Sequence, residues 1–199
     1  MNRAALGFQM HSGWGVLVAV SGQATPVEVI VRRRIVITDP EISGAKQPYH
    51  HAAGLGLPES EDYLAACAAA SERLAIAAIG EVVRDLSAQH YLIVGSAVLL
   101  SSGRSLPSLS NILASHPLIH TAEGELFREA VRKACVGMNI SVTAIRNRDL
   151  DEQATIAFGN EVSRVRLRLS RLGNSIGPPW TKDHKSAALA ASIVLARNS

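Results

Sequence analysis

The chain has 199 residues, of which 47% are hydrophobic and 19% charged, and its formal net charge is +3. This composition is typical of a chain that folds around a core, and it excludes an intrinsically disordered protein. The two cysteines, Cys67 and Cys135, are too few for a disulfide scaffold or a four-cysteine zinc site, so we expect reduced thiols in the core. The length predicts a single domain over residues 1–199.

The apolar segments of the chain are short. None reaches the roughly 20 residues that a membrane-spanning helix needs. Gln9, His11 and Ser12 interrupt the apolar N-terminal stretch early. We therefore expect no membrane partner and no signal peptide, and we expect a cytoplasmic protein.

Five segments have the pattern of β-strands. The first three are separated by short polar turns, which implies an antiparallel meander. The fourth is a nearly continuous apolar run, typical of a parallel strand that is covered on both faces. The predicted strands are residues 4–10, 14–20, 27–37, 91–100 and 140–145.

Four further segments have helical periodicity. Thr121 is the expected N-cap of the second, and acidic residues favour the first turns. The predicted helices are residues 63–86, 121–136, 161–173 and 183–196. The segments between them are expected to be connectors. Residues 39–58, with His50 and His51, 149–160 and 173–180 are expected to be irregular, and residues 106–120 irregular or short-helical.

The basic excess lies in the third predicted helix. Residues 161–173 contain four arginines and one glutamate, so the rest of the chain sums to zero. Apolar residues recur there at helical spacing, which places the arginines on the outer faces of an amphipathic helix. We interpret these arginines as a solvated surface, with phosphate contact as the alternative. Arg32, Arg33 and Arg34 lie within a strand pattern and therefore alternate between its two faces.

The order of elements, β-β-β-α-β-α-β-α-α, resembles the ribonuclease H-like superfamily. Two local sequences are similar to its Holliday-junction resolvase branch: LGFQMHSGWGV at residues 6–16 resembles the first strand and turn, and WTKDHKSAALAA at residues 180–191 resembles the start of the last helix. HPLIHTAEGE at 116–125 and GPPW at 177–180 resemble a bacterial family that adds no functional expectation. The resemblance implies an α/β fold with a five-stranded mixed sheet, three antiparallel strands and then two parallel ones, flanked by helices.

The resemblance also implies a metal-dependent nuclease centre. Nucleases of this superfamily hold two divalent ions with carboxylates on the first strand, at the end of the fourth strand and on the last helix. At these positions this chain has Gln9, then Ser101 with Ser102, and finally Asp183. One carboxylate is too few for two Mg²⁺ ions. The nuclease centre is therefore expected to be incomplete.

The candidate site residues are polar side chains that this fold would gather at one edge of the sheet, where open α/β sheets bind ligands. The catalytic candidates are Asp183, which is also the candidate metal ligand, Glu123, Glu125 and His120. The ligand-binding candidates are Gln9, His11, Ser12, Ser101, Arg104, His116 and His184.

Three of these candidates also have interpretations that involve no ligand. Asp183 stands where a carboxylate can simply cap a helix. His116 and His120 have the spacing of metal ligands on a helix, but Pro117 argues against a continuous helix there, which weakens the metal interpretation.

Three functional hypotheses remain open. The first is a ribonuclease H-like protein that binds nucleic acid or a nucleotide-like ligand at an incomplete nuclease centre. The second is a weak phosphodiesterase that uses Mg²⁺ or Mn²⁺, with Asp183 and either Glu123 or Glu125. The third is a non-catalytic scaffold or homodimer. Actin-like kinases share the core order but need two such domains, and motifs such as GxxxxGK[ST], GxGxxG, GxSxG and CxxC do not occur.

Overall fold

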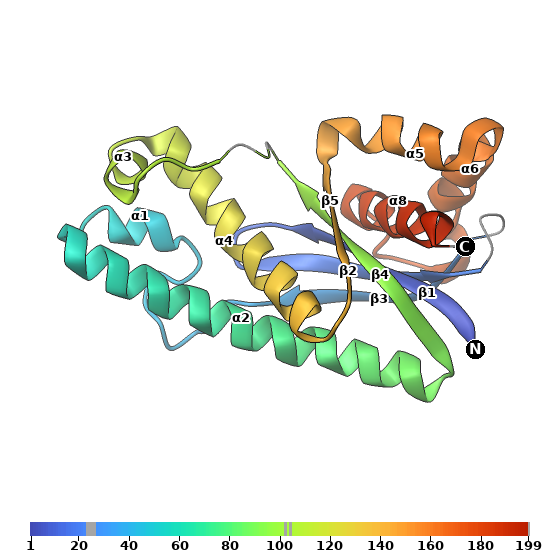
Figure 1. The fold of residues 1–199 in the computed structure, drawn as a ribbon, viewed down its shortest axis with the longest axis horizontal. Coiled ribbons are helices and arrows are strands. Elements are labelled where there is room, and N and C mark those ends of the chain that lie inside the picture. The colour runs from blue at the N-terminus through green and yellow to red at the C-terminus, as the bar shows by residue number, and fades with distance from the viewer. Residues whose placement is uncertain (23–26, 102, 104, 199) are drawn as a thin grey trace.

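A single mixed sheet forms the centre of the computed structural model, which describes residues 1–22, 27–101, 103 and 105–198 (Figure 1). The strands are β1 Asn2–Met10, β2 Trp14–Ser21, β3 Glu28–Val36, β4 Tyr91–Leu100 and β5 Val142–Arg146. They lie in the order β3-β2-β1-β4-β5. The pairs β1–β2 and β2–β3 are antiparallel, and β1–β4 and β4–β5 are parallel. The predicted five-stranded mixed sheet is confirmed.

Helices cover both faces of this sheet. They are α1 Pro48–Ala52, α2 Leu57–Ala88, α3 Leu109–Leu113, α4 His116–Gly137, α5 Leu150–Phe158, α6 Val162–Arg171, α7 Gly173–Ile176 and α8 Lys182–Arg197. Two short 3₁₀ turns, Asn147–Asp149 and Gly159–Glu161, flank α5. α2 and α4 lie on one face, whereas α8 lies on the other with α5 and α6 packed against it (Figure 1). None of the described helices combines the length and apolarity needed to cross a membrane.

The strand alternation divides the core into two apolar layers. Leu6 and Phe8 of β1 face the layer under α2 and α4, and both are fully buried. Val16 and Val18 of β2 face the layer under α8, as the period of two predicts. The arginines of β3 alternate in the same way.

Arg33 and Arg34 show this alternation by their partners. Arg33 pairs with Glu81 and Asp85 of α2 on one face. The Arg34 guanidinium lies 4.0 Å from the centre of the Trp14 ring. Arg32 donates hydrogen bonds to the backbone carbonyls of residues 176–179. The three arginines therefore form no single basic patch.

Gly7 allows α8 to lie directly on β1. A Cβ atom at this position would lie 2.0 Å from the backbone oxygen of Ala187 and 3.1 Å from the Cβ of Ala191. Only a residue without a side chain permits so close an approach of a helix to a strand. This contact fixes the N-terminus of α8 near the end of β1.

The start of α4 differs from the prediction. The helix begins at His116, with Pro117 in its first turn. Proline is compatible with that turn because the N–H groups there have no partner within the helix. Thr121 is consequently inside the helix, and its hydroxyl donates to the Pro117 carbonyl at 2.9 Å. The prediction that Thr121 is the N-cap is wrong.

Other segments expected to be irregular also contain helices. Residues 149–160 include α5, which buries Leu150, Ala154 and Phe158 at helical spacing. The expected loop at residues 39–58 contains α1, so His50 and His51 are helical rather than in a loop. In both cases, packing against a neighbouring helix stabilises a short helix whose local sequence signal is weak.

Candidate functional site

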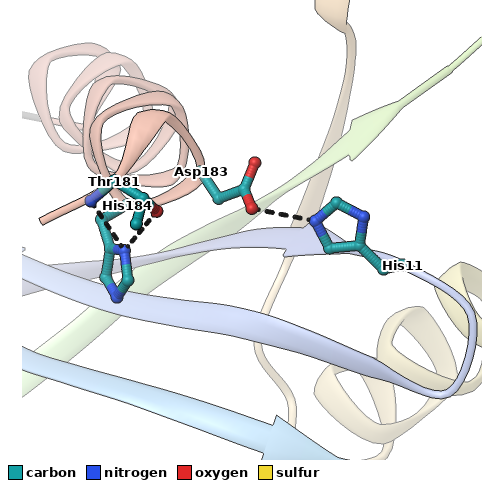
Figure 2. Close-up of polar contacts among 4 residues, drawn as sticks. All are labelled: His11, Thr181, Asp183 and His184. Atoms are coloured by element: carbon teal, nitrogen blue, oxygen red, sulfur yellow. Dashed lines mark hydrogen bonds and ion pairs between the residues drawn. The ribbon is translucent and has the colours of Figure 1, made fainter. Parts of the chain in front are cut away.

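The start of α8 and the turn after β1 meet at one edge of the sheet. The His11 Nε2 atom lies 3.0 Å from the Asp183 Oδ2 atom, although 172 residues separate them in the chain. Figure 2 shows these two side chains pointing toward one another from the turn and the helix. About a third of each side chain is exposed. The pair is therefore accessible to a ligand.

Thr181, rather than Asp183, is the N-cap residue of α8. Its backbone N–H donates to His184 Nδ1 at 3.3 Å, and its hydroxyl lies 2.8 Å from the same atom (Figure 2). Because Nδ1 accepts a hydrogen bond, a neutral His184 ring carries its proton on Nε2. The Asp183 carboxylate lies in the positive first turn of α8 and hydrogen-bonds to His11 instead of capping the helix.

His184 is buried beside this pair, in surroundings that favour the neutral form of its ring. Burial lowers the pKa of His184, and the positive charge of Arg32 lowers it further, while Asp183 acts in the opposite direction. The residue as a whole is only 7% exposed. His184, predicted as a ligand-binding residue, thus takes part in the helix cap.

Trp14 supports the His11 ring. The two rings are stacked with centroids 4.5 Å apart, and the backbone N–H of His11 donates to the Trp14 carbonyl across the turn. With Arg34 on the Trp14 ring, the stack holds the imidazole toward Asp183. Trp14 was not among the predicted site residues, although its place three residues after His11 across a glycine turn is a signal that points to it.

Gln9 and Asp183 line one cleft of about 590 Å³. The cleft lies between the end of β1, the start of α8, and α5 with α6. Its polar lining consists of Gln9, Asn147, Asp151, Arg166, Ser170, Lys182, Asp183, Lys185 and Ser186, and Leu150, Leu169 and Leu189 complete it. Two of the three positions that the resemblance assigns to the nuclease centre, Gln9 and Asp183, therefore share a cavity, whereas Ser101 is not among the described residues that line it.

The charges of this cleft favour an anion. Asp151 pairs with Arg166 at 2.8 Å, and Asp183 is hydrogen-bonded to His11. Lys182 and Lys185 have no ion-pair partner within the described part of the chain. The lining residues include three cationic and two anionic side chains, so their net charge is +1.

The remaining acidic candidates lie apart from this cleft. Glu123 hydrogen-bonds to His50, and Glu125 pairs with Arg128 at 2.9 Å. Arg128 also donates to the Ser101 hydroxyl at 3.1 Å. Neither glutamate is among the described residues that line the Asp183 cleft.

The other predicted site residues lie around the start of α4 or beyond the described part of the chain. His116 and His120 lie in the first turns of α4 beside His50, which was not among the predicted site residues. Ser12 lines a separate pocket with His50. Arg104 and Ser102 fall outside the described residues.

Comparison with models of protein families and with curated proteins gives no match. Among solved structures, "Thermus thermophilus RuvC structure" is 13% identical, with a TM-score of 0.51, and the match covers 98% of this chain and 95% of that one. The fold is ribonuclease H-like. A second structure, "T. thermophilus RuvC in complex with Holliday junction substrate", is 15% identical with a TM-score of 0.49 and the same coverage. At 13% identity, the likeness to the first of these structures establishes the fold alone.

In this ribonuclease H-like fold, the cleft beside Asp183 contains few free carboxylates. Both carboxylates in its lining already have a partner, His11 or Arg166. Among the described residues, the group of three or more potential metal ligands lies elsewhere, at His50, His116 and His120. The cleft therefore offers hydrogen-bond donors and two lysines rather than the several negative charges that two divalent ions require.

Proposed function

We propose that this ribonuclease H-like protein binds the phosphate backbone of nucleic acid in the cleft between the end of β1 and the start of α8. The observation that carries the proposal is the lining of this cleft. A neutral Gln9 stands at the end of β1, and two lysines without ion-pair partners in the described chain, Lys182 and Lys185, lie in the first turn of α8.

The electrostatics of the α8 N-terminus support this proposal. Unpaired backbone N–H groups and the helix dipole favour an anion near that end. The ammonium groups of the two lysines add positive charge. When they contact phosphates, the counterions condensed on the nucleic acid are released, and this release is a large part of the affinity of proteins for nucleic acid. Arg166 stands on the α6 side of the same cleft, where it also pairs with Asp151.

The His11–Asp183 pair gives the cleft a polar group of fixed orientation. The hydrogen bond to His11 disperses the negative charge of the Asp183 carboxylate, so that this group repels a nearby phosphate less than a free carboxylate would. The Gln9 amide, in turn, can both donate to a phosphate oxygen and accept from a ribose or base. The cleft therefore suits contact with a backbone more than the binding of two metal ions.

Fluorescence anisotropy with labelled nucleic acids tests the proposal. The probes are a four-way DNA junction, a DNA duplex and a single-stranded RNA. We expect binding at low salt, weakened in Lys182→Ala and Lys185→Ala. If each lysine contacts one phosphate, the slope of log K against log salt on duplex DNA falls by about 0.9 for each substitution. Arg84→Ala is the matched control, because Arg84 is an exposed cation on α2, on the other face of the sheet.

Two results would contradict the proposal. One is the absence of salt-dependent binding to all three probes. The other is equal affinity of the wild type and both lysine variants. Cleavage of a probe that requires Mg²⁺ or Mn²⁺ and disappears in Asp183→Asn would instead establish the phosphodiesterase hypothesis.

A further inference from the structure

We propose that His50, His116 and His120 form a binding site for a transition-metal ion of the Zn²⁺ type, with Glu123 as the group that orients His50. This site is separate from the Asp183 cleft. One ring nitrogen of each histidine lies within 4.8 Å of those of the other two. The ring centroids are 4.5 to 5.3 Å apart.

The start of α4 supplies two of the ligands. His116 and His120 are four residues apart in one helix, so their side chains project from the same face. This is the spacing with which two histidines of one helix bind one metal ion. The arrangement exists because α4 begins at His116, with Pro117 accommodated in its first turn.

The short helix α1 supplies the third ligand. Tyr49, the residue before His50, packs against a small apolar cluster formed by Ile112, Ile119 and Ala122. These residues come from α3 and α4, so the cluster attaches α1 to the start of α4. His50 is thereby held beside the two helical histidines by contacts that do not involve a metal.

Glu123 determines which nitrogen of His50 is available. Its Oε1 atom lies 2.8 Å from His50 Nδ1 and accepts a hydrogen bond from the backbone N–H of His50 at 3.2 Å. The Glu123 side chain is only 1% exposed. When a buried carboxylate accepts a hydrogen bond from Nδ1–H, the proton of the neutral ring stays on Nδ1 and the lone pair of Nε2 is free. Metal-binding histidines are commonly oriented in this way.

One nitrogen from each of the three rings is near enough to the others for a modest adjustment to bring them around one ion. With Zn–N bonds of 2.0–2.1 Å, tetrahedral ligands have nitrogens about 3.4 Å apart. Bringing atoms that lie within 4.8 Å to that separation needs movements of at most about 1.4 Å. His116 and His120 are exposed, so rotation of their side chains can provide this adjustment.

The donor set selects the class of ion. Imidazole nitrogens suit Zn²⁺, Cu²⁺ and Ni²⁺, whereas Mg²⁺ and Mn²⁺ favour oxygen ligands. Three histidines leave the fourth tetrahedral position open to solvent, as in zinc sites that bind water or a substrate atom. This ion is therefore chemically distinct from the Mg²⁺ or Mn²⁺ considered for Asp183.

Metal titration of the untagged, chelator-treated protein tests the site. Zn²⁺ is added in competition with a chromogenic chelator, and Co²⁺ is added separately to record the visible absorption of a tetrahedral nitrogen site. We expect one equivalent of Zn²⁺ per chain. Glu123→Gln is expected to weaken the affinity about 10–100-fold, as loss of a group that orients a ligand does. His116→Ala and His120→Ala are expected to weaken it further.

His51→Ala is the matched control. His51 adjoins His50 in α1, but its ring packs against Tyr63 instead of the cluster. The control should bind Zn²⁺ as the wild type does. Because His116 and His120 are exposed, their variants should keep the wild-type circular dichroism, so the test does not depend on the buried Glu123. The proposal would be overturned if the wild type did not bind Zn²⁺ stoichiometrically. It would also be overturned if His116→Ala and His120→Ala bound Zn²⁺ with the affinity of the wild type.

Discussion

Replacement of Gly7 by alanine should separate α8 from β1. The new Cβ would lie 2.0 Å from the Ala187 oxygen and 2.8 Å from the Ala187 carbonyl carbon. A carbon and a carbonyl oxygen in contact normally lie at least about 3.3 Å apart, so the helix must move by about 1.3 Å. Both atoms belong to the backbone in the middle of α8, so no side-chain rotation relieves the clash.

Gly7→Ala is expected to lower the free energy of unfolding by an amount at the upper end of the range for overpacked core substitutions. Such substitutions typically cost about 1–3 kcal/mol, and we expect about 3 kcal/mol of unfolding free energy here because Ala187 and Ala191 are fully buried. For a chain of this size, a change of that magnitude lowers the Tm by about 6–12 °C. Urea and thermal unfolding followed by circular dichroism measure both quantities.

Gly137→Ala is the control for this experiment. A Cβ at Gly137, the last residue of α4, would have no neighbour within 4 Å. Alanine there reduces the entropy of the unfolded chain and should raise stability by up to about 1 kcal/mol. If Gly7→Ala unfolds at the same urea concentration as the wild type, the close approach of α8 to β1, and with it the placement of Asp183 beside His11, is refuted.

Two further predictions concern ionisable groups. The pKa of His184 is lowered in the folded state, so the unfolded chain binds the extra proton first, and stability should fall as pH drops below the unfolded value of about 6.5. Urea midpoints at pH 7.5 and 5.5 should differ less in His184→Gln than in the wild type, and an equal difference would contradict this assignment. Burial raises the pKa of Cys135 to about 11 and also raises that of Cys67, so iodoacetamide at pH 8 should leave both thiols unmodified. Mass spectrometry should find both thiols alkylated only after unfolding, and rapid labelling of the native protein would contradict their burial.

The sheet could be predicted because strand patterns are local. Alternation in β2 and the long apolar run of β4 identify these strands without knowledge of their partners. The helix α5 was missed because Leu150, Ala154 and Phe158 are separated by polar residues that resemble a connector. Their common burial becomes evident only when α8 is in place beneath them.

The candidate sites were predicted unevenly for the same reason. Gln9, His11 and Asp183 were selected because a resemblance at both ends of the chain places those ends together. His50 was not joined to His116 and His120, because their proximity depends on the packing of α1 against α4, which no local pattern encodes. Pro117 is also ambiguous as a sequence signal, because proline interrupts the interior of a helix but is compatible with its first turn.

The three consecutive arginines of β3 affect the solubility of the protein because β3 lies at the edge of the sheet. β3 is the terminal strand of the sheet, and its outer backbone has no strand partner among the described residues. Without residues 32–34, its sequence would be the apolar run Val29-Ile30-Val31 followed by Ile35-Val36. Such a strand is a template for intermolecular pairing, and charged side chains along an edge strand oppose that pairing. Neutral replacements at these positions would therefore favour aggregation even where they leave the fold intact.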